Sequence, residues 1–282
     1  MATIDLHAHS TCSDGELTPE ALVLRAAAGG LQVLALTDHD SVAGCAPAMR
    51  VAATCGLHLL AGVELSTQWL GVNVHIIALG LDLQAPPLLQ LLERQAGVRE
   101  RRAVAIGERL AALGFAGVYE AALARSASVQ SIGRLHFAQV LQERGVVRSV
   151  QQAFDRYLGT GRKAAVPLDW IGMEEGVAIL NQVAKVTVLA HPLRYGLSRT
   201  RLTQLLTAFA QAGGRALEVA TPVQLPGEWP WLLAQATKHA LFCSQGSDFH
   251  GPSTPWAELG GFAELPDTGS SVWRLLSDDR AA

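Results

Sequence analysis

Two histidines near the start of the chain are spaced for metal binding. Thr3 to His7 reads as a short β-strand, and residues two apart in extended backbone, such as His7 and His9, point to the same side. Two neighbouring imidazoles can bind one divalent metal ion. Asp14 follows in a turn that Gly15 allows, and its carboxylate could serve the same ion or a neighbouring one. Taken alone, this pattern is more typical of a strand end with incidental polar residues.

The later part of the chain supplies partners for this pair. Further predicted strands carry or are followed by imidazoles and carboxylates, which gives nine candidate ligands: His7, His9, Asp14, His39, Glu64, His75, His191, Asp248 and His250. Imidazole and carboxylate ligands without cysteine suit manganese, zinc or iron. Their number suits two or three ions with a carboxylate bridging between ions. The set therefore indicates a multinuclear metal site.

The elements that must position these residues alternate between strands and helices. Helices are predicted between most of the strands, which cover residues 3–7, 31–37, 57–62, 72–79, 186–190, 216–220 and 240–244. Continuous apolar runs such as 31–37 are typical of parallel strands that are buried on both faces. The alternation predicts βαβ units in a parallel sheet or barrel, where functional groups collect at the carboxyl ends of the strands. We therefore expect the nine side chains to converge there.

The middle of the chain has a different character. Residues 88–113 form a long helical pattern rich in arginine, and further helical segments follow without a strong strand signal. We predict that residues 100–165 form an inserted α-helical, substrate-binding subdomain, and that residues 1–99 and 166–282 form the barrel domain. With 282 residues, 49% of them hydrophobic, the chain can form one large α/β domain with such an insertion.

Composition argues against several classes of function. The formal net charge of −3 argues against a broad electrostatic grip on long duplex nucleic acid. No apolar run is long enough to span a bilayer, and no signal peptide precedes the first strand, so we expect no membrane partner. The four cysteines show no paired spacing, which favours reduced thiols and a cytoplasmic protein.

The motifs around the candidate ligands resemble those of the PHP (polymerase and histidinol phosphatase) superfamily. The resemblance covers nearly the whole chain and rests on Asp5-Leu6-His7-Ala8-His9, Thr37-Asp38-His39-Asp40, Glu64-Leu65-Ser66, His191-Pro192 and Ser247-Asp248-Phe249-His250. It implies a distorted (β/α)7 barrel with a trinuclear metal site. Residues 132–136 and 159–164 are similar to segments of a narrower bacterial group, which contains a 3′,5′-nucleoside bisphosphate phosphatase and a 5′-to-3′ exoribonuclease.

The resemblance also implies how the ligands divide among the ions. His7, His9, Glu64 and Asp248 would hold one ion, Glu64 would bridge to a second held with His75 and His191, and Asp14, His39 and His250 would hold the third. We expect two or three divalent ions per chain, with Mn²⁺ favoured and Zn²⁺ or Fe²⁺ as alternatives. Asp38 and Asp40 are explained equally well as turn residues or as groups that orient His39.

Charge arithmetic favours a phosphate substrate. Three divalent ions bring six positive charges, of which Asp14, Glu64 and Asp248 remove three, so the pocket would attract a phosphoryl dianion. These three carboxylates are the predicted catalytic residues. We expect a metal-bridging hydroxide to attack phosphorus in line, because metal binding can bring the pKa of water to about 7. Asp14, Asp248 or a metal-bound water could protonate the leaving oxygen, and the sequence does not choose among them.

Basic residues in and near the insertion are candidates for substrate binding, because a guanidinium can hold phosphate with two parallel hydrogen bonds. The candidates are Arg101, Arg102, Arg134, His136 and Arg194. For the arginines of the long helix, a solvated helix face is an equally good explanation. Trp229, Trp231 and Trp256 could stack on a base, although tryptophan more commonly covers apolar surface.

These observations favour a metal-dependent phosphoesterase that hydrolyses the 3′-phosphate of 3′,5′-bisphosphonucleotides and so converts pAp to AMP and phosphate. The first alternative is a 5′-to-3′ exoribonuclease on short 5′-phosphorylated RNA, which needs the same metals and phosphate clamp. A histidinol phosphate phosphatase is less favoured, because a singly phosphorylated amino alcohol does not require paired clamps. The last alternative is a non-catalytic metal-binding module, which the intact ligand types at all nine positions argue against.

Overall fold

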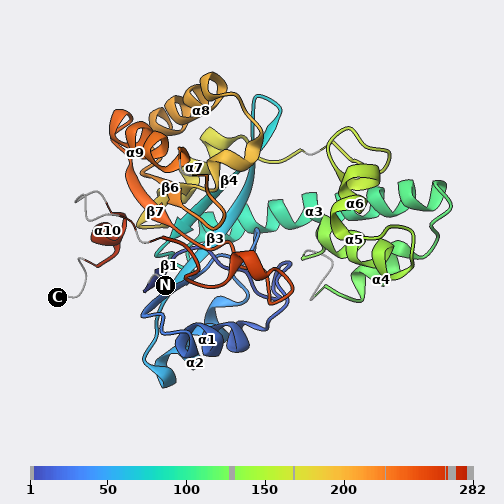
Figure 1. The fold of residues 1–282 in the computed structure, drawn as a ribbon, viewed down its shortest axis with the longest axis horizontal. Coiled ribbons are helices and arrows are strands. Elements are labelled where there is room, and N and C mark those ends of the chain that lie inside the picture. The colour runs from blue at the N-terminus through green and yellow to red at the C-terminus, as the bar shows by residue number, and fades with distance from the viewer. Residues whose placement is uncertain are drawn as a thin grey trace.

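Seven strands form the centre of the molecule. The computed structural model describes residues 3–126, 131–167, 169–225, 227–263, 265 and 271–277. The strands pair with one another in the order in which they follow along the chain (Figure 1). They are β1 (Ile4–Asp5), β2 (Val33–Leu36), β3 (His58–Trp69), β4 (Val72–Leu79), β5 (Val186–Leu189), β6 (Ala216–Ala220) and β7 (Phe242–Gln245). The predicted α/β class is confirmed.

The two ends of the sheet lie side by side. The backbone N–H of Leu6 donates to the carbonyl of Gln245 at 3.1 Å, and Ala8 forms a parallel bridge with Phe249. These contacts continue the strand order from β7 back to β1 and give the sheet the barrel-like arrangement that the sequence predicts. They also bring the segment after β7 beside the segment after β1.

One strand contradicts the prediction of a parallel sheet. β4 is antiparallel to both β3 and β5, whereas the other neighbouring strands are parallel. The reason is the two-residue connection Leu70-Gly71, in which φ is 45° and 78°. Turns of this kind join antiparallel strands, whereas parallel strands need a long crossover. As a result β3 runs past its predicted end at residue 62 to Trp69, and Glu64 lies within the strand instead of after it.

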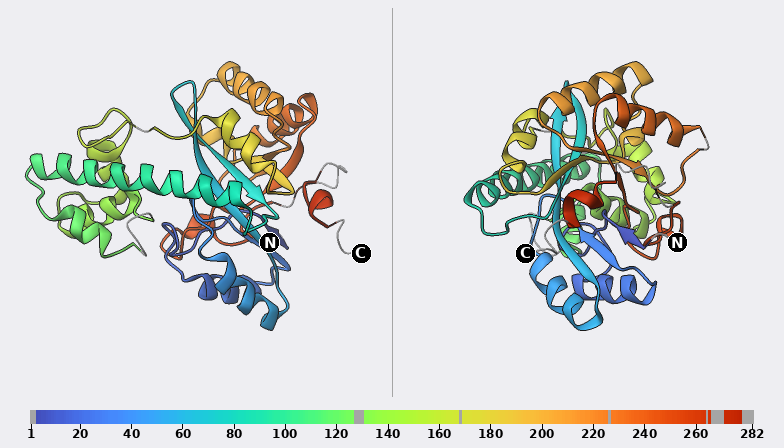
Figure 2. Two further views of the ribbon diagram at one scale, coloured as in Figure 1. Left: turned by 180° about the vertical axis from the view of Figure 1, so that it is seen from behind. Right: turned by 90° about the vertical axis from the view of Figure 1, so that its left-hand side faces the viewer.

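Helices cover the outside of the sheet (Figure 2). They are α1 (Pro19–Ala28), α2 (Cys45–Cys55), α7 (Met173–Leu180), α8 (Arg199–Gln211) and α9 (Glu228–Lys238), and a short α10 (Trp273–Ser277) follows near the end of the described chain. Thr18 and Ser198 cap α1 and α8, since their side-chain oxygens accept hydrogen bonds from backbone N–H groups of the first turn. In the part of the chain that the structure describes, no helix is both long and apolar enough to cross a membrane.

A second lobe is built from helices and projects from the sheet (Figure 1). It contains α3 (Pro86–Ala112), which starts beside the sheet, followed by α4 (Val118–Leu123), α5 (Arg134–Glu143), α6 (Val150–Ala153) and a π-helical turn, η1 (Phe154–Leu158). The lobe has its own hydrophobic cluster, which includes Ile106, Leu110, Phe137 and Leu141. This cluster lies in the part of the chain where the sequence predicts an insertion over residues 100–165, and that division into domains stays a prediction.

A buried ion pair fixes α3 against the sheet. Arg99 Nε donates to Asp40 Oδ2 at 2.7 Å, and Gln95 Nε2 donates to Asp40 Oδ1 at 3.1 Å and to the carbonyl of Ser66 at 2.6 Å. Burial alone would raise the pKa of Asp40, but the guanidinium of Arg99 lowers it. Removing one partner would leave an uncompensated buried charge, so this contact holds the lobe in a defined position relative to the end of the sheet.

Candidate metal centre

The nine predicted ligands all lie at one end of the sheet. Most of them follow the parallel strands: His7, His9 and Asp14 after β1, His39 after β2, His191 after β5, and Asp248 and His250 after β7. Glu64 lies within β3 at the level where β2 ends, because it forms a bridge with His39. His75 is near the start of β4, which reaches the same edge because β4 runs antiparallel.

Glu64 is the centre of the cluster and is fully buried. Five ring nitrogens surround its carboxylate: Oε2 lies 3.1 to 3.2 Å from those of His7, His9 and His39, and Oε1 lies 2.8 Å from those of His75 and His191. Burial alone would raise the pKa of this carboxyl, but the surrounding imidazoles hold it well below its usual value. Glu64 is therefore ionised and can contact two neighbouring cations through its two oxygens.

Four ligand atoms lie at the corners of a tetrahedron. They are Nε2 of His7, Nε2 of His9, Oε2 of Glu64 and Oδ1 of Asp248. The five distances that involve a ring nitrogen lie between 3.1 and 3.3 Å, and the two carboxylate oxygens lie within 4.8 Å of each other. The centre of such a tetrahedron is about 2 Å from each corner, which is the length of a bond from zinc to an imidazole nitrogen or carboxylate oxygen. A cation at that centre would satisfy all four atoms. The spacing therefore fits a metal ion.

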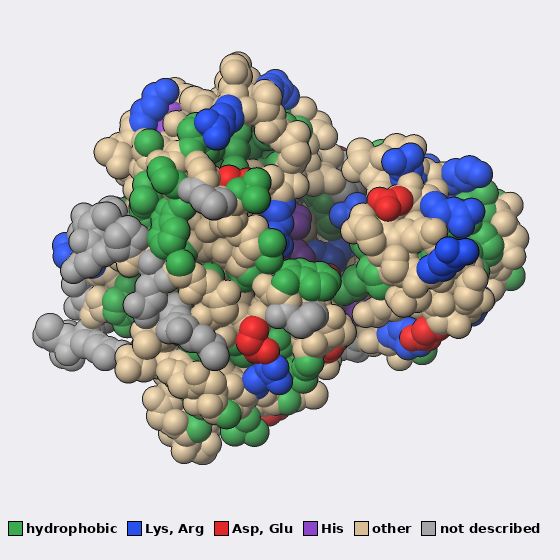
Figure 3. Space-filling view, in the orientation of Figure 1, with side chains coloured by type: hydrophobic (Ala, Val, Ile, Leu, Met, Phe, Trp, Pro, Cys, Tyr) green, Lys and Arg blue, Asp and Glu red, His purple; other side chains and the backbone are tan. Residues whose placement is uncertain are grey.

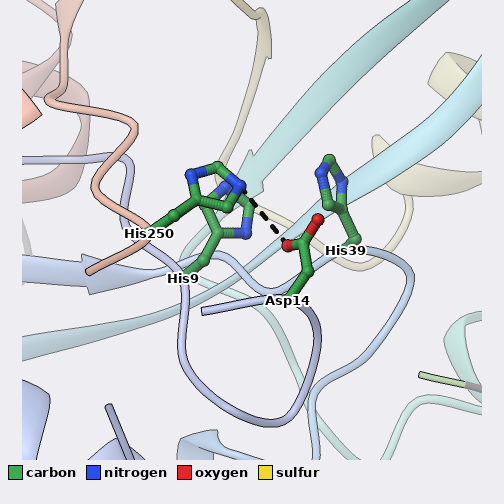
Figure 4. Close-up of side chains that lie close together, drawn as sticks. All are labelled: His9, Asp14, His39 and His250. Atoms are coloured by element: carbon green, nitrogen blue, oxygen red, sulfur yellow. Dashed lines mark ion pairs between the residues drawn. The ribbon is translucent and has the colours of Figure 1, made fainter. Parts of the chain in front are cut away.

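Two further groups of ligand atoms adjoin this tetrahedron. One ligand atom each from His9, Asp14, His39 and His250 lies within 4.8 Å of the others (Figure 4), and the same holds for His39, Glu64 and His75. Within the first group, His250 Nε2 is 3.3 Å from Asp14 Oδ1. His191 belongs to none of the three groups found among the described residues, although its Nε2 contacts Glu64.

Three buried atoms in these groups accept or donate no hydrogen bond among the described residues. They are Asp14 Oδ1, His39 Nδ1 and Glu64 Oε2. A buried polar atom without a partner costs about 1–3 kcal/mol. Each of the three lies beside other ligand atoms, so divalent cations would satisfy them together. Carboxylate oxygen and imidazole nitrogen are ligands that manganese, iron and zinc accept, and the residues therefore fit a multinuclear metal site.

Two of the ligand imidazoles, those of His7 and His250, have a high affinity for positive charge. Burial alone would lower the pKa of His7 and His250. Nevertheless Glu64 raises the pKa of His7 well above its usual value, and Asp14 raises the pKa of His250 to about 10. Protons and metal ions therefore compete for these nitrogens, as is usual for histidine ligands.

Glu218 supports two of the ligands and was missed by the sequence pattern. It is fully buried in β6, where Oε1 accepts a hydrogen bond from His7 Nδ1 at 3.0 Å and Oε2 accepts one from the backbone N–H of His191 at 2.6 Å. The first bond places the proton on Nδ1 and directs the lone pair of Nε2 into the cluster. The sequence feature that could have identified Glu218 is a single carboxylate in the middle of the apolar run 216–220.

The loops that carry the ligands are held in defined conformations. Asp38 accepts three hydrogen bonds at 2.7 Å, from the backbone and hydroxyl of Ser10 and from the hydroxyl of Ser13, and so fixes the loop before Asp14. His191 and Asp248 have φ of 25° and 53°, where residues other than glycine are uncommon. Such backbone persists only where surrounding contacts enforce it, and it concentrates at functional sites.

A cleft lies between the ligand cluster and the helical lobe, and Figure 3 shows histidine and basic side chains together in this hollow. Its inner part, of about 110 Å³, is lined by the ligands Asp14, His39 and His75 and by Arg99, Arg102 and Arg134. Arg102 and Arg134 also line an outer part of about 430 Å³. An anion bound in the inner part would face metal ligands on one side and guanidinium groups on the other.

Arg102 and Arg134 are predicted substrate residues whose charge is not neutralised. Neither takes part in an ion pair with another described residue, and Nε of Arg102 is buried without a hydrogen-bond partner there. Burial lowers the pKa of both guanidinium groups, and repulsion from neighbouring arginines, Arg99 among them, lowers it further. Bound phosphate would relieve both effects, so the pair is suited to an anion, and its role in substrate binding stays a prediction.

The other predicted substrate residues are placed differently. Arg101 is exposed and does not line the described parts of the cleft. His136 caps α5, because its Nδ1 accepts a hydrogen bond from the backbone N–H of Gly133 at 2.9 Å. Arg194 forms an ion pair with Asp248.

The chain is similar to characterised bacterial proteins over nearly its whole length. It is 42% identical to the 5′-3′ exoribonuclease Rnm of Escherichia coli (strain K12), over 96% of this chain and 92% of that protein. It is 38% identical to the 3′,5′-nucleoside bisphosphate phosphatase of Chromobacterium violaceum, over 98% of this chain and 97% of that protein.

Structural comparison and a family model agree with these similarities. The structure of an amidohydrolase from Chromobacterium violaceum, with bound sulfate and no metal, superimposes with a TM-score of 0.92 at 37% identity, over 98% of this chain and 96% of that one. The model of the PHP domain matches residues 5–160. The resemblance seen in the sequence motifs is therefore confirmed: the chain belongs to the PHP domain family and is a metal-dependent phosphoesterase.

Proposed function

We propose that this phosphoesterase hydrolyses the 3′-phosphate of 3′,5′-bisphosphonucleotides, converting pAp to AMP and phosphate. The observation that carries the proposal is the cleft in which Arg102 and Arg134 face the ligand cluster. One nucleotide with two phosphates could bind both, with its 3′-phosphate at the cluster and its 5′-phosphate at the arginines. The name of the Chromobacterium violaceum relative supports the same substrate class.

The ligand cluster would hold two or three divalent ions, and manganese is the proposed metal. We assign the ions to three ligand sets: His7, His9, Glu64 and Asp248; Glu64, His75 and His191; Asp14, His39 and His250. When bound, the ions would withdraw charge from the phosphoryl oxygens and lower the pKa of a water nucleophile. Three carboxylates among the ligands leave the site with net positive charge, which favours a dianionic phosphoryl group.

The side chains of the protein would position the substrate and transfer the proton. Arg102 and Arg134 would hold the 5′-phosphate and so orient the 3′-phosphate toward the cluster. Hydrolysis breaks the bond between phosphorus and O3′, adds the oxygen of water to phosphorus and leaves a hydroxyl at O3′. Burial alone would raise the pKa of Asp14 and Asp248, but the neighbouring imidazoles hold it well below its usual value, so both carboxylates are ionised. They would therefore pass a proton from water to O3′, while Glu64 holds the imidazoles in place.

A 5′-to-3′ exoribonuclease is the second candidate, because the same bond to O3′ would be cleaved when RNA continues beyond the phosphate. The name of the Escherichia coli relative supports it. The structural observation in its favour is a further cavity beside Asp248 and His250, where such RNA could continue.

Phosphate release from a substrate panel tests the proposal. With Mn²⁺ added, we expect hydrolysis of pAp with a kcat/KM about 10- to 100-fold above that for histidinol phosphate, since charged hydrogen bonds to the second phosphate contribute about 1.5–3 kcal/mol. Equal rates for both compounds would contradict the paired phosphate sites. Inertness toward pAp, AMP, histidinol phosphate and 5′-phosphorylated oligonucleotides would instead favour a non-catalytic module.

Replacing Glu218 with Gln tests whether this residue supports the metal ligands. We expect metal affinity to fall about 10- to 100-fold, because the amide keeps one acceptor for His7 but turns an N–H₂ group toward the backbone N–H of His191. Competition with a chelator measures this affinity directly. Glu174→Gln, in the first turn of α7, is the control. An unchanged affinity in the Glu218 variant would contradict the supporting role.

A further inference from the structure

A second cavity borders the ligand cluster through different residues. The arginine-lined part of the cleft contacts the cluster at Asp14, His39 and His75. The second cavity, of about 350 Å³, contacts it at Asp248 and His250. Its volume falls in the range of sites for small ligands, roughly 300–1,000 Å³. The cluster is therefore open to substrate on two sides.

The walls of this second cavity combine apolar and basic side chains. Trp256, in the short helix η3 (Pro255–Ala257), is 65% exposed, and Val223 is 76% exposed. Arg194 also lines it, with half of its side chain exposed. Single exposed apolar residues are common on protein surfaces. Here an exposed indole and a half-exposed arginine that pairs with Asp248 share one cavity with two metal ligands, and aromatic and basic side chains together are typical of sites for single-stranded nucleic acid.

We propose that this cavity binds the second nucleoside of a short single-stranded RNA, with its base stacked on Trp256. The inference rests on the proposed function, because it assumes that the cleaved phosphate lies at the ligand cluster and the 5′-phosphate at Arg102 and Arg134. The first nucleoside then lies on the arginine side. A nucleoside esterified to the same phosphate must continue elsewhere, and the cavity at Asp248 and His250 is open to it.

The chemistry of the two substrates is the same at the reacting bond. In pApA, as in pAp, water adds to phosphorus and the bond to O3′ of the first nucleoside breaks. The phosphoryl group stays on O5′ of the second nucleoside, and O3′ takes a proton. The product pA thus carries a new 5′-phosphate of the kind that the arginine pair is proposed to bind. Arg194 lines this cavity and pairs with Asp248, and its guanidinium has five N–H donors, so it could also contact the RNA backbone while it keeps that pair.

Comparing pAp with pApA as substrates tests the role of Trp256. We expect the wild-type protein with Mn²⁺ to hydrolyse both. Trp256→Ala and Trp256→Leu should lower kcat/KM for pApA about tenfold, mainly through KM, and at least fivefold more than for pAp, because both remove the stacking surface. Trp256→Phe should restore most of the pApA activity. Leu24→Ala, which removes another exposed apolar side chain on α1, is the matched control.

The outcomes separate this inference from the proposed function. Equal losses on pAp and pApA would mean that Trp256 contacts the first nucleoside, and no loss on either would mean that it contacts neither; both results overturn the inference. If the wild-type protein hydrolyses pAp but not pApA, the second subsite is refuted and the phosphatase proposal stands. If it hydrolyses neither pAp nor pApA, both the second subsite and the phosphatase proposal are refuted. Thermal unfolding of each variant shows whether the fold is intact, and the Phe variant keeps the comparison decisive if the Ala variant is unstable.

Discussion

The Glu64→Gln variant is expected to lose at least about a thousandfold in kcat for pAp while remaining folded. Glu64 is the only carboxylate among the described ligands that contacts five imidazoles. An amide removes one negative charge and turns two donor hydrogens toward ring nitrogens that must offer lone pairs. A thousandfold loss in kcat corresponds to about 4 kcal/mol of lost transition-state stabilisation. Bound metal ions supply several kcal/mol of such stabilisation, so a loss of this size is expected when they are no longer held.

Metal content and activity should be measured together in this variant. We expect fewer bound Mn²⁺ ions per chain by elemental analysis, and near-wild-type secondary structure by circular dichroism. Glu175→Gln is the matched control, because that carboxylate is half-exposed and pairs with Arg94 on the surface. A Glu64→Gln protein with full metal content and full activity would show that the carboxylate does not hold the ions together.

The ligand positions could be predicted because they follow buried apolar runs. His39 comes after the run 31–37, and His191 comes after the run 186–190. The carboxyl ends of parallel strands meet at one edge of a sheet, so residues far apart in sequence could be assigned to one site without coordinates. Glu218 escaped this reasoning because it lies inside a strand, where only its charge distinguishes it from its apolar neighbours.

The sequence did not reveal that β3 and β4 form a hairpin, nor where β3 ends. In the sequence, Gly62 suggests the end of a strand, yet it lies within β3. A Cβ at this position would come within 2.8 Å of Thr37 and 2.9 Å of the Ala78 carbonyl. Glycine is required by close packing at this position and does not mark a turn. The turn is at Leu70-Gly71, where both residues have positive φ. Leucine rarely adopts positive φ, so its presence in the sequence does not suggest a turn of this type.

The orientation of α3 decides which of its arginines reach the cleft. Gln95, Arg99 and Arg102 are spaced i, i+4 and i+7, so they share one face of the helix, and Arg101 lies about 100° away from Arg102. The spacing was present in the sequence. Polar residues on one helix face, however, are typical of a solvated surface until the partner surface is known. Only the structure shows Asp40 and the ligand cluster opposite this face.

Replacing Arg134 with Ala is expected to raise KM for pAp about 10- to 100-fold and to change KM for a simple aryl phosphate far less. The guanidinium lines the cleft beside Asp14 and His39, and it forms no ion pair with any described residue, so its charge is available for a second phosphate. Charged hydrogen bonds of this kind contribute about 1.5–3 kcal/mol, and each 1.4 kcal/mol is a factor of ten. An aryl phosphate has no group that reaches this site, and steady-state kinetics on both substrates measures the difference.

Arg101→Ala provides the control for net charge, because it removes one positive charge from the same lobe at an exposed position. If long-range attraction of the anionic substrate were the cause, both variants would raise KM similarly, and the effect would shrink as salt is added. A direct contact predicts that only Arg134→Ala has the large effect and that it persists at high salt. An equal rise in KM for pAp and for the aryl phosphate would refute the phosphate clamp, since Arg134 would then act on the reacting phosphate or on the cluster itself.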